Sequence, residues 1–402
     1  MSRRRILVGG TALGALGAVQ LASAPAGWSW SSSGSIAGGT TTTDPNTVWD
    51  DPADWIAAAV LGRGGVAEVN AALATWVTNA DAVPGAAPSD VADFIATARQ
   101  LPSWADQAQL DRAAQFNKDQ GDVIAVLYGM GSGMMSCLIP HEARAVYYSR
   151  GGATMKDRIA KTAKLGYDIG AVDAYRPAGS MVVTAVKTRL VHAAVRTLLP
   201  QSAYWTPTAD QSRPISQRDL LITWHSLASF VMANLEKWKV PVSAADKAAY
   251  LHLWQVSAHL LGIQDQFIPA TWEDAYAQKA QLLDPVIAPT SEGLKLAQIL
   301  INLGSDADGG FLSKPMLQAM TRYVLGGTYA DMLAIPRQPL LDASIAAGWP
   351  GFIAMREAGL NLPLMGDLYN LFDEFLRQGA LFYLSSGQRI DIVMPDANRQ
   401  SF

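Results

Sequence analysis

The chain has almost no cysteine, since only Cys137 among its 402 residues carries a thiol. A single thiol excludes an intramolecular disulfide, a cysteine-based zinc cluster, an iron–sulfur centre and a covalent Cys-x-x-Cys-His haem. Cys137 lies in an apolar run, so we expect it to be a small buried residue. The stability of the folded chain must therefore come from its packed core.

Charge is also scarce. Charged residues make up 16% of the chain and hydrophobic residues 50%, whereas an average soluble domain is about a quarter charged. Such a chain can bury a large core or keep apolar surface for a ligand. The net charge is −4, and it becomes −7 without residues 1–26, which hold three arginines and no acid. No basic tract remains, so a nucleic-acid partner is excluded.

Strand signals and internal repeats are missing too. No alternating β-branched run is bounded by Asn-Gly or Asp-Gly. Helical periodicity begins at Pro52, a proline suited to a first helical turn. The apolar stretch from Trp349 to Leu384 is expected to pack in the core or to line a hydrophobic channel. The periodicity predicts a mostly α-helical domain over 51–402, with helices near 52–62, 65–78, 88–99, 105–118, 155–166, 181–199, 215–239, 244–262, 270–282, 291–303 and 313–325.

The N-terminus has the pattern of a twin-arginine signal peptide. Arg3, Arg4 and Arg5 precede an apolar run, and a small-residue site follows at Ala24-Pro25-Ala26. The alternative, an anchoring helix, needs roughly 20 apolar residues, more than this run supplies. Residues 1–26 therefore predict secretion of the folded chain to the extracellular space without a stable membrane anchor. Residues 27–50, rich in Ser, Gly and Thr, are expected to be a flexible linker.

A glycine-dense passage occupies residues 121–139. It lacks the glycine spacing of a dinucleotide-binding fingerprint, and Ser132 lacks the glycine offsets of a nucleophile elbow. Glycine removes the bulk of a side chain, so the passage predicts close approach of this backbone to a flat ligand or to another helix.

Two candidate site segments follow the glycines. Glu142 is preceded by His141, but the sequence His-Glu-Ala-Arg-Ala is not a His-Glu-x-x-His zinc motif. Glu142 is either an exposed acid in a first helical turn or a general base. In the helix near 155–166, Arg158, Lys161 and Thr162 share one face, which is either a solvated basic face or part of a pocket.

The helix near 181–199 contains His192, with Thr188 one turn before it and Arg196 one turn after. A neutral imidazole on such a helix can ligate iron, and Arg196 can meet a haem propionate; the alternative is a hydrogen-bonded core histidine. His252 and His259 are seven residues apart and share a face, but no third ligand accompanies them, so the pattern supports a metal site only weakly and leaves the role of the two histidines open.

These segments resemble a known family. Residues 140–148 (Pro-His-Glu-Ala-Arg-Ala-Val-Tyr-Tyr), 155–162 and 189–196 resemble the latex-clearing proteins, which are secreted actinobacterial rubber oxygenases. Residues 259–263, with Ile268-Pro269, are similar to the wider oxygenase group. The resemblance covers nearly the whole chain after the leader, and the leader is of the same type.

The resemblance implies an all-α fold, with a globin-like core over about residues 120–335 and additional helices at the N- and C-terminal ends. It also implies one non-covalent haem b. His192 matches the proximal iron ligand, and Lys161 matches a distal lysine that caps the iron in a closed state. The other positions that match functional residues are Arg158 and Thr162 in the distal pocket, Glu142 as the base and Arg196 near the haem.

The implied reaction is cleavage of the C=C bonds of cis-1,4-polyisoprene by O2. Its products are oligo-isoprenoids with one aldehyde and one ketone end, and the enzyme is expected to act as a monomer. Three alternatives remain open. They are a related haem oxygenase acting on a small terpenoid or lipid, a globin-like protein that binds haem or O2 without catalysis, and an apolar-ligand binder without haem.

Overall fold

The computed structural model describes residues 34–38, 41–150, 154–307, 313–360, 385–387 and 390–399. Within these ranges the regular structure is helical, and the only β pairings are two isolated bridges, Ser35–Pro269 and Ser149–Asn398. The all-α prediction is confirmed. The predicted signal peptide lies outside the described residues, as does most of the apolar stretch after Leu360.

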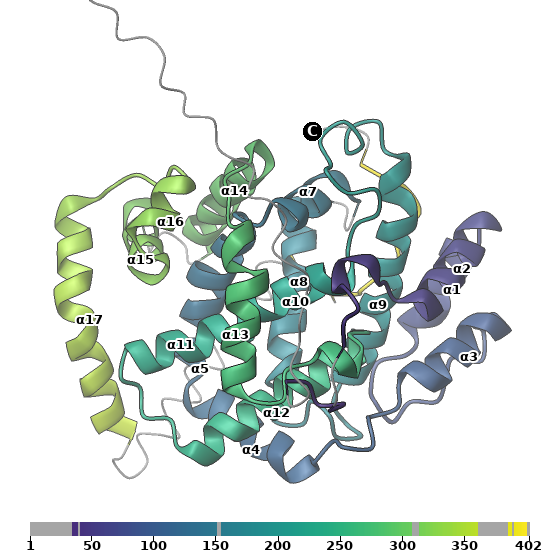
Figure 1. Cartoon of the computed structure of the whole chain (residues 1–402), viewed down its shortest axis with the longest axis horizontal. Coiled ribbons are helices and arrows are strands. Elements are labelled where there is room, and N and C mark those ends of the chain that lie inside the picture. Colours follow the sequence, from purple (N-terminus) through teal and green to yellow (C-terminus); the bar gives the residue numbers. More distant parts are fainter. Residues whose placement is uncertain are drawn as a thin grey trace, which may run out of the picture.

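Seventeen α-helices occur in the described ranges, joined by short 3-10 and π segments (Figure 1). They are α1 Asp51–Gly62, α2 Val66–Ala74, α3 Ser89–Ala98, α4 Gln107–Asp119, α5 Gly121–Val126, α6 Gly133–Ser136, α7 Pro140–Tyr148, α8 Met155–Ile169, α9 Met181–Leu198, α10 Gln217–Trp224, α11 Phe230–Lys237, α12 Ala244–Leu260, α13 Trp272–Leu282, α14 Ser291–Ala307, α15 Lys314–Leu325, α16 Gly327–Met332 and α17 Pro339–Leu360. The shorter segments are η1 Pro45–Thr47, η2 Leu127–Ser132, η3 Leu199–Gln201, η4 His225–Ser229, η5 Asp265–Phe267 and η6 Asp284–Val286.

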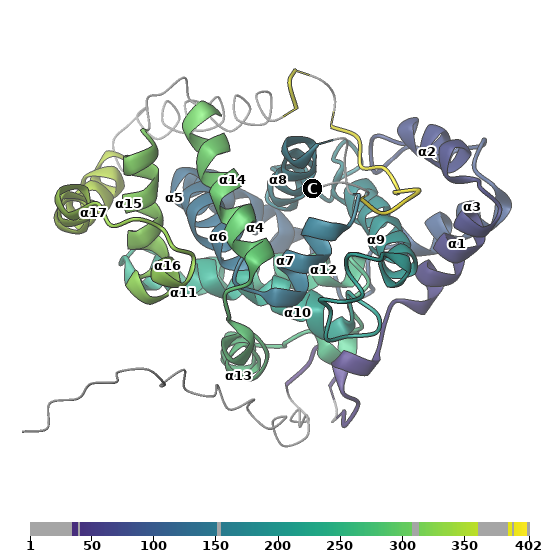
Figure 2. The ribbon, with the colours of Figure 1, turned by 90° about the horizontal axis from the view of Figure 1, so that it is seen from above.

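The helices from the two ends of the chain lie at opposite ends of the molecule. Figures 1 and 2 show α1, α2 and α3 at one end, and α15, α16 and α17 at the other. The helices α4 to α12 lie between them, with α1 packed along α9 and α12 packed along α4. The central group therefore carries α7, α8 and α9, on which the predicted site residues lie.

Burial explains the central position of α9. Thirteen of its 18 residues are buried, because the sequence Met-Val-Val-Thr-Ala-Val leaves no polar face in its first two turns. Such a helix must be covered on several sides. It contacts α1, α8 and α12, and its last two turns hold His192 and Arg196.

The glycine-dense passage forms one helical run with a π segment, η2, between α5 and α6. A Cβ at Gly131 would overlap the ring of Phe230 in α11 and would lie 3.0 Å from Val324 of α15. Of the two close approaches predicted for this passage, the structure shows the approach to other helices at Gly131. A π turn is a common way to displace one helical face at a functional site.

The predicted end of the helix near 65–78 was wrong for a local reason. The helix expected over 65–78 ends at Ala74, because the carboxylate of Asp81 accepts hydrogen bonds from the backbone N–H groups of Val77 and Thr78 and turns the chain there. The helix α17, which begins at Pro339, was not among the predicted helices. Proline fits a first helical position because its missing N–H would have no partner there.

The described part of residues 27–50, predicted to be a flexible linker, packs against the helices. The backbone N–H of Ile36 donates to Ile268 O at 3.0 Å, and that of Gln217 donates to Val48 O at 2.8 Å. The segment ends in η1 and in the buried carboxylate of Asp50, which accepts two hydrogen bonds from Arg189. Residues 41–50 thus belong to the packed body.

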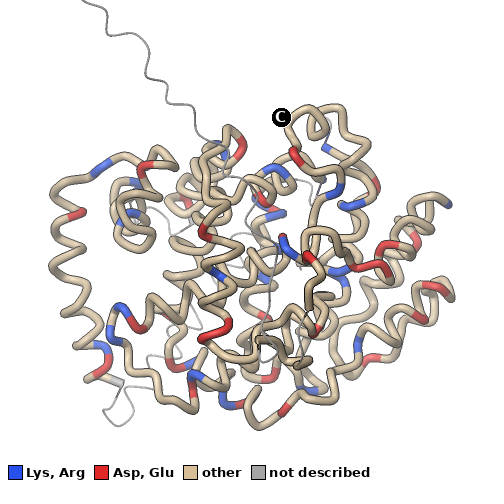
Figure 3. The backbone as a smooth tube through the Cα atoms, in the orientation of Figure 1, with Lys and Arg blue, Asp and Glu red and all other residues tan. Residues whose placement is uncertain are grey.

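Charges of both signs are interspersed over the whole molecule (Figure 3). Among the described residues, no single helix is both long and apolar enough to cross a bilayer. Two sharply bent helix pairs reach that length and composition together, namely Pro45–Gly62 with Val66–Ala74 and Gly121–Ser136 with Pro140–Tyr148.

Candidate functional site

His192 lies in α9 with an unsatisfied ring. Its Nδ1 is buried and has no hydrogen-bond partner among the residues that the structure describes. Burial lowers the pKa of His192 to about 3, and the positive charges of Arg196 and Arg158 act in the same direction. The ring is therefore neutral at ordinary pH, and a buried polar atom without a partner is uncommon in a folded protein. A neutral, unpartnered imidazole can ligate a metal, so His192 fits the predicted role of haem ligand.

Arg196 has most of its guanidinium bonded to protein. Its Nε lies 2.5 Å from Asp54 Oδ1 in α1, and its Nη1 donates to Ile215 O at 3.2 Å. Asp54 also pairs with Arg213. Of the three guanidinium nitrogens of Arg196, Nη2 is the one that is buried without a hydrogen bond to the residues that the structure describes. Arg196 therefore joins α9 to α1, and one nitrogen is left over for the predicted contact with a haem propionate.

Arg158 is held in α8, which begins where the Thr154 side chain accepts a hydrogen bond from the Asp157 backbone N–H. Its Nη1 donates to Ser149 Oγ at 2.6 Å and to Ser149 O at 3.2 Å, at the end of α7. Burial lowers the pKa of Arg158 to about 10, with a further contribution from the charge of Arg399. Arg158 is thus a half-buried cation that joins α8 to the C-terminal end of α7.

The other two residues of this face are more accessible. Lys161 Nζ lies 3.1 Å from Asp157 one turn earlier, and 15% of its side chain is exposed. Thr162 is exposed, and its hydroxyl donates to Arg158 O at 3.3 Å. The i to i+4 pair with Asp157 is the one the sequence spacing allows, so any other role of Lys161 requires it to leave this partner.

Glu142 lies in the first turn of α7, which Pro140 opens. Burial raises the pKa of this carboxyl to about 8, and the charge of Asp219 adds to the rise. A hydrogen bond from the Thr223 hydroxyl and the charge of His141 act in the opposite direction. Glu142 is therefore a carboxyl group poised to exchange a proton near neutral pH, as expected of a general base.

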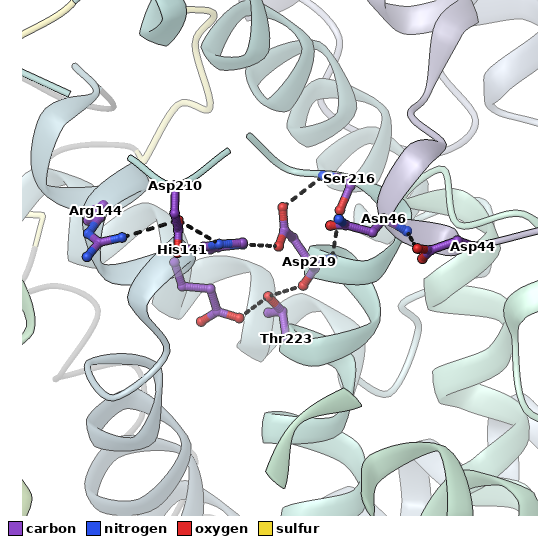
Figure 4. Close-up of polar contacts among 9 residues, drawn as sticks. Asp44, Asn46, His141, Arg144, Asp210, Ser216, Asp219 and Thr223 are labelled. Carbon is purple, nitrogen blue, oxygen red and sulfur yellow. Dashed lines mark hydrogen bonds and ion pairs between the residues drawn. The ribbon is translucent and has the colours of Figure 1, made fainter. Parts of the chain in front are cut away.

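Three residues beside Glu142 were not singled out from the sequence. Figure 4 shows the ring of His141 between Asp219 and Asp210, with Thr223 below Asp219 on α10. Ser216 and Asp219 form a capping box at the start of α10, a spacing that the sequence shows. The contact between α10 and α7 could not be predicted from neighbouring residues, because 78 positions separate His141 from Asp219.

The predicted residues fall into two groups. Arg158 and His192 lie near enough to influence each other electrostatically, because α8 packs on α9. Glu142 lies at the other end of α7 from Ser149, the residue that binds Arg158. Among the described contacts Glu142 bonds to Thr223, whereas Arg158 bonds to Ser149.

The remaining histidines have structural partners. His225 is buried between Ser229 and Gln278, 2.9 Å from each, and burial lowers its pKa to about 3. His252 Nε2 accepts from the Asp106 backbone N–H at 2.9 Å. His225 therefore fixes η4 to α13, and His252 fixes the start of α4 to α12.

His259 completes this set without forming a metal site. Its Nδ1 lies 2.6 Å from Asp265, which also accepts from Trp104. Across the residues that the structure describes, no group of three or more His, Cys, Asp or Glu is placed to hold a metal ion. Cys137 is buried, and burial raises the pKa of its thiol to about 12, so it behaves as the small apolar residue expected.

Comparisons with known proteins found proteins similar to this chain. Residues 118–354 match the family described as the catalytic domain of the ER-bound oxygenase mpaB/B' and rubber oxygenase. A protein of Streptomyces sp. (strain K30) named "Rubber oxygenase" is 53% identical over 404 residues, covering 100% of this chain and 99% of its own length. The solved structure of a latex clearing protein, LCP, in the closed state superposes with a TM-score of 0.84, covering 92% of this chain and 100% of the other at 53% identity.

Proposed function

The chain belongs to the family of mpaB/B' and rubber oxygenases, and on this premise we infer that it is a cofactor-dependent oxygenase that cleaves rubber with O2. The premise rests on likeness over the full length of the chain. Within the structure, the observation that carries the proposal is the neutral ring of His192, whose buried Nδ1 has no hydrogen-bond partner among the described residues.

We propose that the cofactor is a non-covalent haem b. His192 would ligate its iron, Lys161 could approach it on leaving Asp157, and the spare Nη2 of Arg196 would meet a propionate. A single Cys137 leaves no Cys-x-x-Cys-His site for covalent attachment. When bound, the haem supplies the binding and activation of O2.

The net reaction joins one O2 to one C=C bond of cis-1,4-polyisoprene. The double bond breaks, each of its carbons gains one oxygen atom, and the two new chain ends are an aldehyde and a ketone. No external reductant is needed, because both oxygen atoms end in the products.

Glu142 is proposed to take an allylic proton from the polymer and to return it later. Its carboxyl has a pKa of about 8, so roughly a tenth of the molecules are ionised at neutral pH, and the basicity of the ionised form is correspondingly high. The Thr223 hydrogen bond holds one carboxylate oxygen and leaves the other for the substrate. Arg158, a half-buried cation of α8, would stabilise negative charge that develops on the substrate.

We further propose that the protein is secreted through a twin-arginine leader and works as a monomer at the polymer surface. The arginines at positions 3–5 and the apolar run after them support export. An extracellular enzyme of this kind would meet its water-insoluble substrate outside the cell.

The first experiment is an absorption spectrum of the purified mature protein with a pyridine haemochrome assay, followed by carbonyl analysis after incubation with latex and O2. About one haem b per chain, together with oligo-isoprenoid carbonyls, is expected. Haem with reversible O2 binding but no carbonyls would indicate an O2 carrier. A folded but colourless protein would show that no haem is bound, and it would favour a protein that binds an apolar ligand.

Two variants test the residues. His192→Ala should lose haem, whereas the matched His259→Gln should keep it, because His259 pairs with Asp265 far from α9 in sequence. Glu142→Gln should keep haem and lower turnover by about 10²–10⁴-fold, the range typical of a lost general base. Full turnover in Glu142→Gln would remove Glu142 from the mechanism, and a normal haem spectrum in His192→Ala would remove His192 as the ligand.

A further inference from the structure

The ring of His141 has a carboxylate on each side. Its Nδ1 lies 2.9 Å from Asp219 Oδ1, and its Nε2 lies 3.0 Å from Asp210 Oδ1. Carboxylate oxygens accept hydrogen bonds, so both ring nitrogens must carry a proton to make both bonds. The geometry therefore requires the imidazolium form, whichever tautomer the neutral ring would prefer.

Electrostatics agree with this protonation. Burial by itself would lower the pKa of His141, but the hydrogen bond and negative charge of Asp219 and the charge of Asp210 outweigh it, so the pKa is raised. His141 is a partly buried cation, with 23% of its side chain exposed. It joins a buried acid, Asp219, to an exposed one, Asp210.

Asp219 is fixed in place by its own helix. Its Oδ2 accepts from the Ser216 backbone N–H at 3.0 Å, and its backbone N–H donates to Ser216 Oγ, which closes the capping box of α10. With Oδ1 bonded to His141, both carboxylate oxygens have partners. The negative charge of Asp219 is therefore held at one position, 6% exposed.

Both members of this pair adjoin Glu142. His141 precedes Glu142 in the first turn of α7. Thr223 joins Asp219 to Glu142, because its hydroxyl donates to the Glu142 carboxylate and lies 3.1 Å from Asp219 O (Figure 4). Glu142 therefore lies between a fixed positive neighbour and a fixed negative neighbour.

We propose that His141 and Asp219 form a charge pair that sets the protonation of Glu142, acting as positioning residues that do not touch the substrate. This role rests on the proposed function of Glu142 as the base. The imidazolium of His141 favours the carboxylate form of Glu142, and the carboxylate of Asp219 favours the acid form. Together the two charges keep both the acid form and the carboxylate form of Glu142 accessible.

Other charged groups lie near His141 and Asp219, but none takes over the role of either residue. Arg144 Nη1 lies 3.3 Å from Asp210 and so belongs to the outer, exposed side of the cluster. Arg218 of α10 opposes the charge of His141, but more weakly than the two acids support it. On the α14 side, Glu292 bonds to Tyr148 at the far end of α7. Cys137, which precedes α7, is uncharged.

The pair makes an unusual prediction, because its two members act with opposite sign. His141→Gln removes the positive neighbour, so Glu142 should hold its proton to higher pH. Asp219→Asn removes the negative neighbour, so Glu142 should release its proton at lower pH. The second shift should be smaller, because loss of Asp219 also weakens the hold on the His141 proton, although Asp210 remains on Nε2.

The experiment is an infrared pH titration of the holoenzyme that follows the protonated carboxyl band of Glu142, identified as the band missing in Glu142→Gln. We expect the midpoint to rise by on the order of one pH unit in His141→Gln and to fall by less in Asp219→Asn, as is typical when a single charge is lost next to a partly buried group. The double variant should return toward the wild-type midpoint. The pH profile of kcat/KM should move with the midpoint in each variant.

His259→Gln is the matched control, since it breaks a His–Asp pair that does not adjoin Glu142 and should leave the midpoint unchanged. Midpoints that stay fixed, or that move the same way in both single variants, would overturn the charge pair. If Glu142→Gln kept full turnover while the midpoints moved as expected, the base role would fail and the electrostatic coupling would stand. The two failures are therefore distinguishable.

Discussion

Thr223 bonds to Glu142 through a hydroxyl that has a second acceptor, the backbone oxygen of Asp219, 3.1 Å away. A threonine hydroxyl has one hydrogen and two lone pairs. When Glu142 is ionised, the hydroxyl can donate to the carboxylate. When Glu142 is protonated, the carboxyl can donate to Thr223 Oγ1 and the hydroxyl can turn to Asp219 O. One side chain thus satisfies both protonation states.

Replacing Thr223 by Val should therefore damage the ionised state of Glu142 most. The Thr223 hydrogen bond lowers the pKa of Glu142 against the larger effect of burial, so its loss should raise that pKa further. We expect turnover near neutral pH to fall by about tenfold, because a pKa that is higher by about one leaves roughly a tenth as much of the ionised base. A pH–rate profile measures this as a displacement to higher pH.

Thr223→Ser is the matched control, because serine keeps the hydroxyl and loses only a methyl group. It should retain the wild-type pH profile with a small loss of stability. A profile displaced equally in the Ser and Val variants would show that the hydroxyl is not what holds Glu142.

The same carboxyl should make stability depend on pH. The pKa of Glu142 in the folded protein is about 8, above its ordinary value of 4.5. Below the ordinary value both the folded and the unfolded chain bind this proton, so the contribution of the raised pKa to stability is fully present. Between about 4.5 and 8 the unfolded chain releases this proton while the folded protein keeps it, so stability falls as the pH rises, and the contribution is lost once the pH passes about 8 and the folded protein ionises too.

Glu142→Gln cannot ionise and should escape that loss. We expect its Tm to be close to that of the wild type near pH 5 and clearly higher near pH 9. At pH 9 its unfolding free energy should exceed that of the wild type by on the order of a few kcal/mol. Glu273, an exposed acid in the first turn of α13, provides the control. Glu273→Gln should follow the wild-type curve at both pH values. Parallel curves for all three proteins would contradict a buried, protonated Glu142.

Much of the fold could be predicted because helical periodicity and capping are local. The helix near 181–199 was predicted almost to its ends, since a run of apolar residues with His192 and Arg196 one turn apart has no other regular structure available. The end of α2 was not predicted, because a carboxylate beyond the helix, Asp81, captures the backbone there.

The same distinction between local and long-range contacts applies to the site. The helical position of Glu142 and the face shared by Arg158 and Lys161 could be predicted, because each depends on spacing within one helix. The raised pKa of Glu142 was expected only on condition of burial, and that burial depends on α10, far away in the sequence. The contact with Thr223 and the partner of Arg196 are long-range for the same reason. A single sequence carries no signal for either contact, because the partners lie far apart along the chain.

The pair between Asp54 and Arg196 tests how α1 is attached to α9. The guanidinium of Arg196 is 1% exposed, and Asp54 bonds to it from the first turn of α1. Removing one partner of a buried pair leaves the other charge uncompensated, which typically costs about 3–5 kcal/mol. Asp54→Asn should lower the unfolding free energy by this order, measured by urea denaturation of the holoenzyme.

Asp90 gives a matched comparison, because it also lies in a first helical turn and pairs with an arginine, Arg63, 2.6 Å away. That pair is exposed, with about a third of each side chain accessible, and exposed pairs contribute about 0–1 kcal/mol. Asp90→Asn should thus be nearly neutral. Equal losses in the two variants would mean that the Arg196 pair is no more buried in solution than the Arg63 pair.

Two glycines of the π segment η2 should respond to alanine with opposite sign. Gly131 is buried, and an added Cβ would overlap the ring of Phe230. Overpacking of this kind costs about 1–3 kcal/mol. Gly129, two residues earlier, is exposed, and no atom of the described residues lies within 4 Å of an added Cβ. Alanine there restricts the unfolded chain and should be neutral or stabilising by up to about 1 kcal/mol.

Thermal unfolding of the Gly131→Ala and Gly129→Ala variants measures both changes in stability. A stable Gly131→Ala variant would show that Phe230 can move aside, and that close contact between η2 and α11 is not what selects glycine at this position.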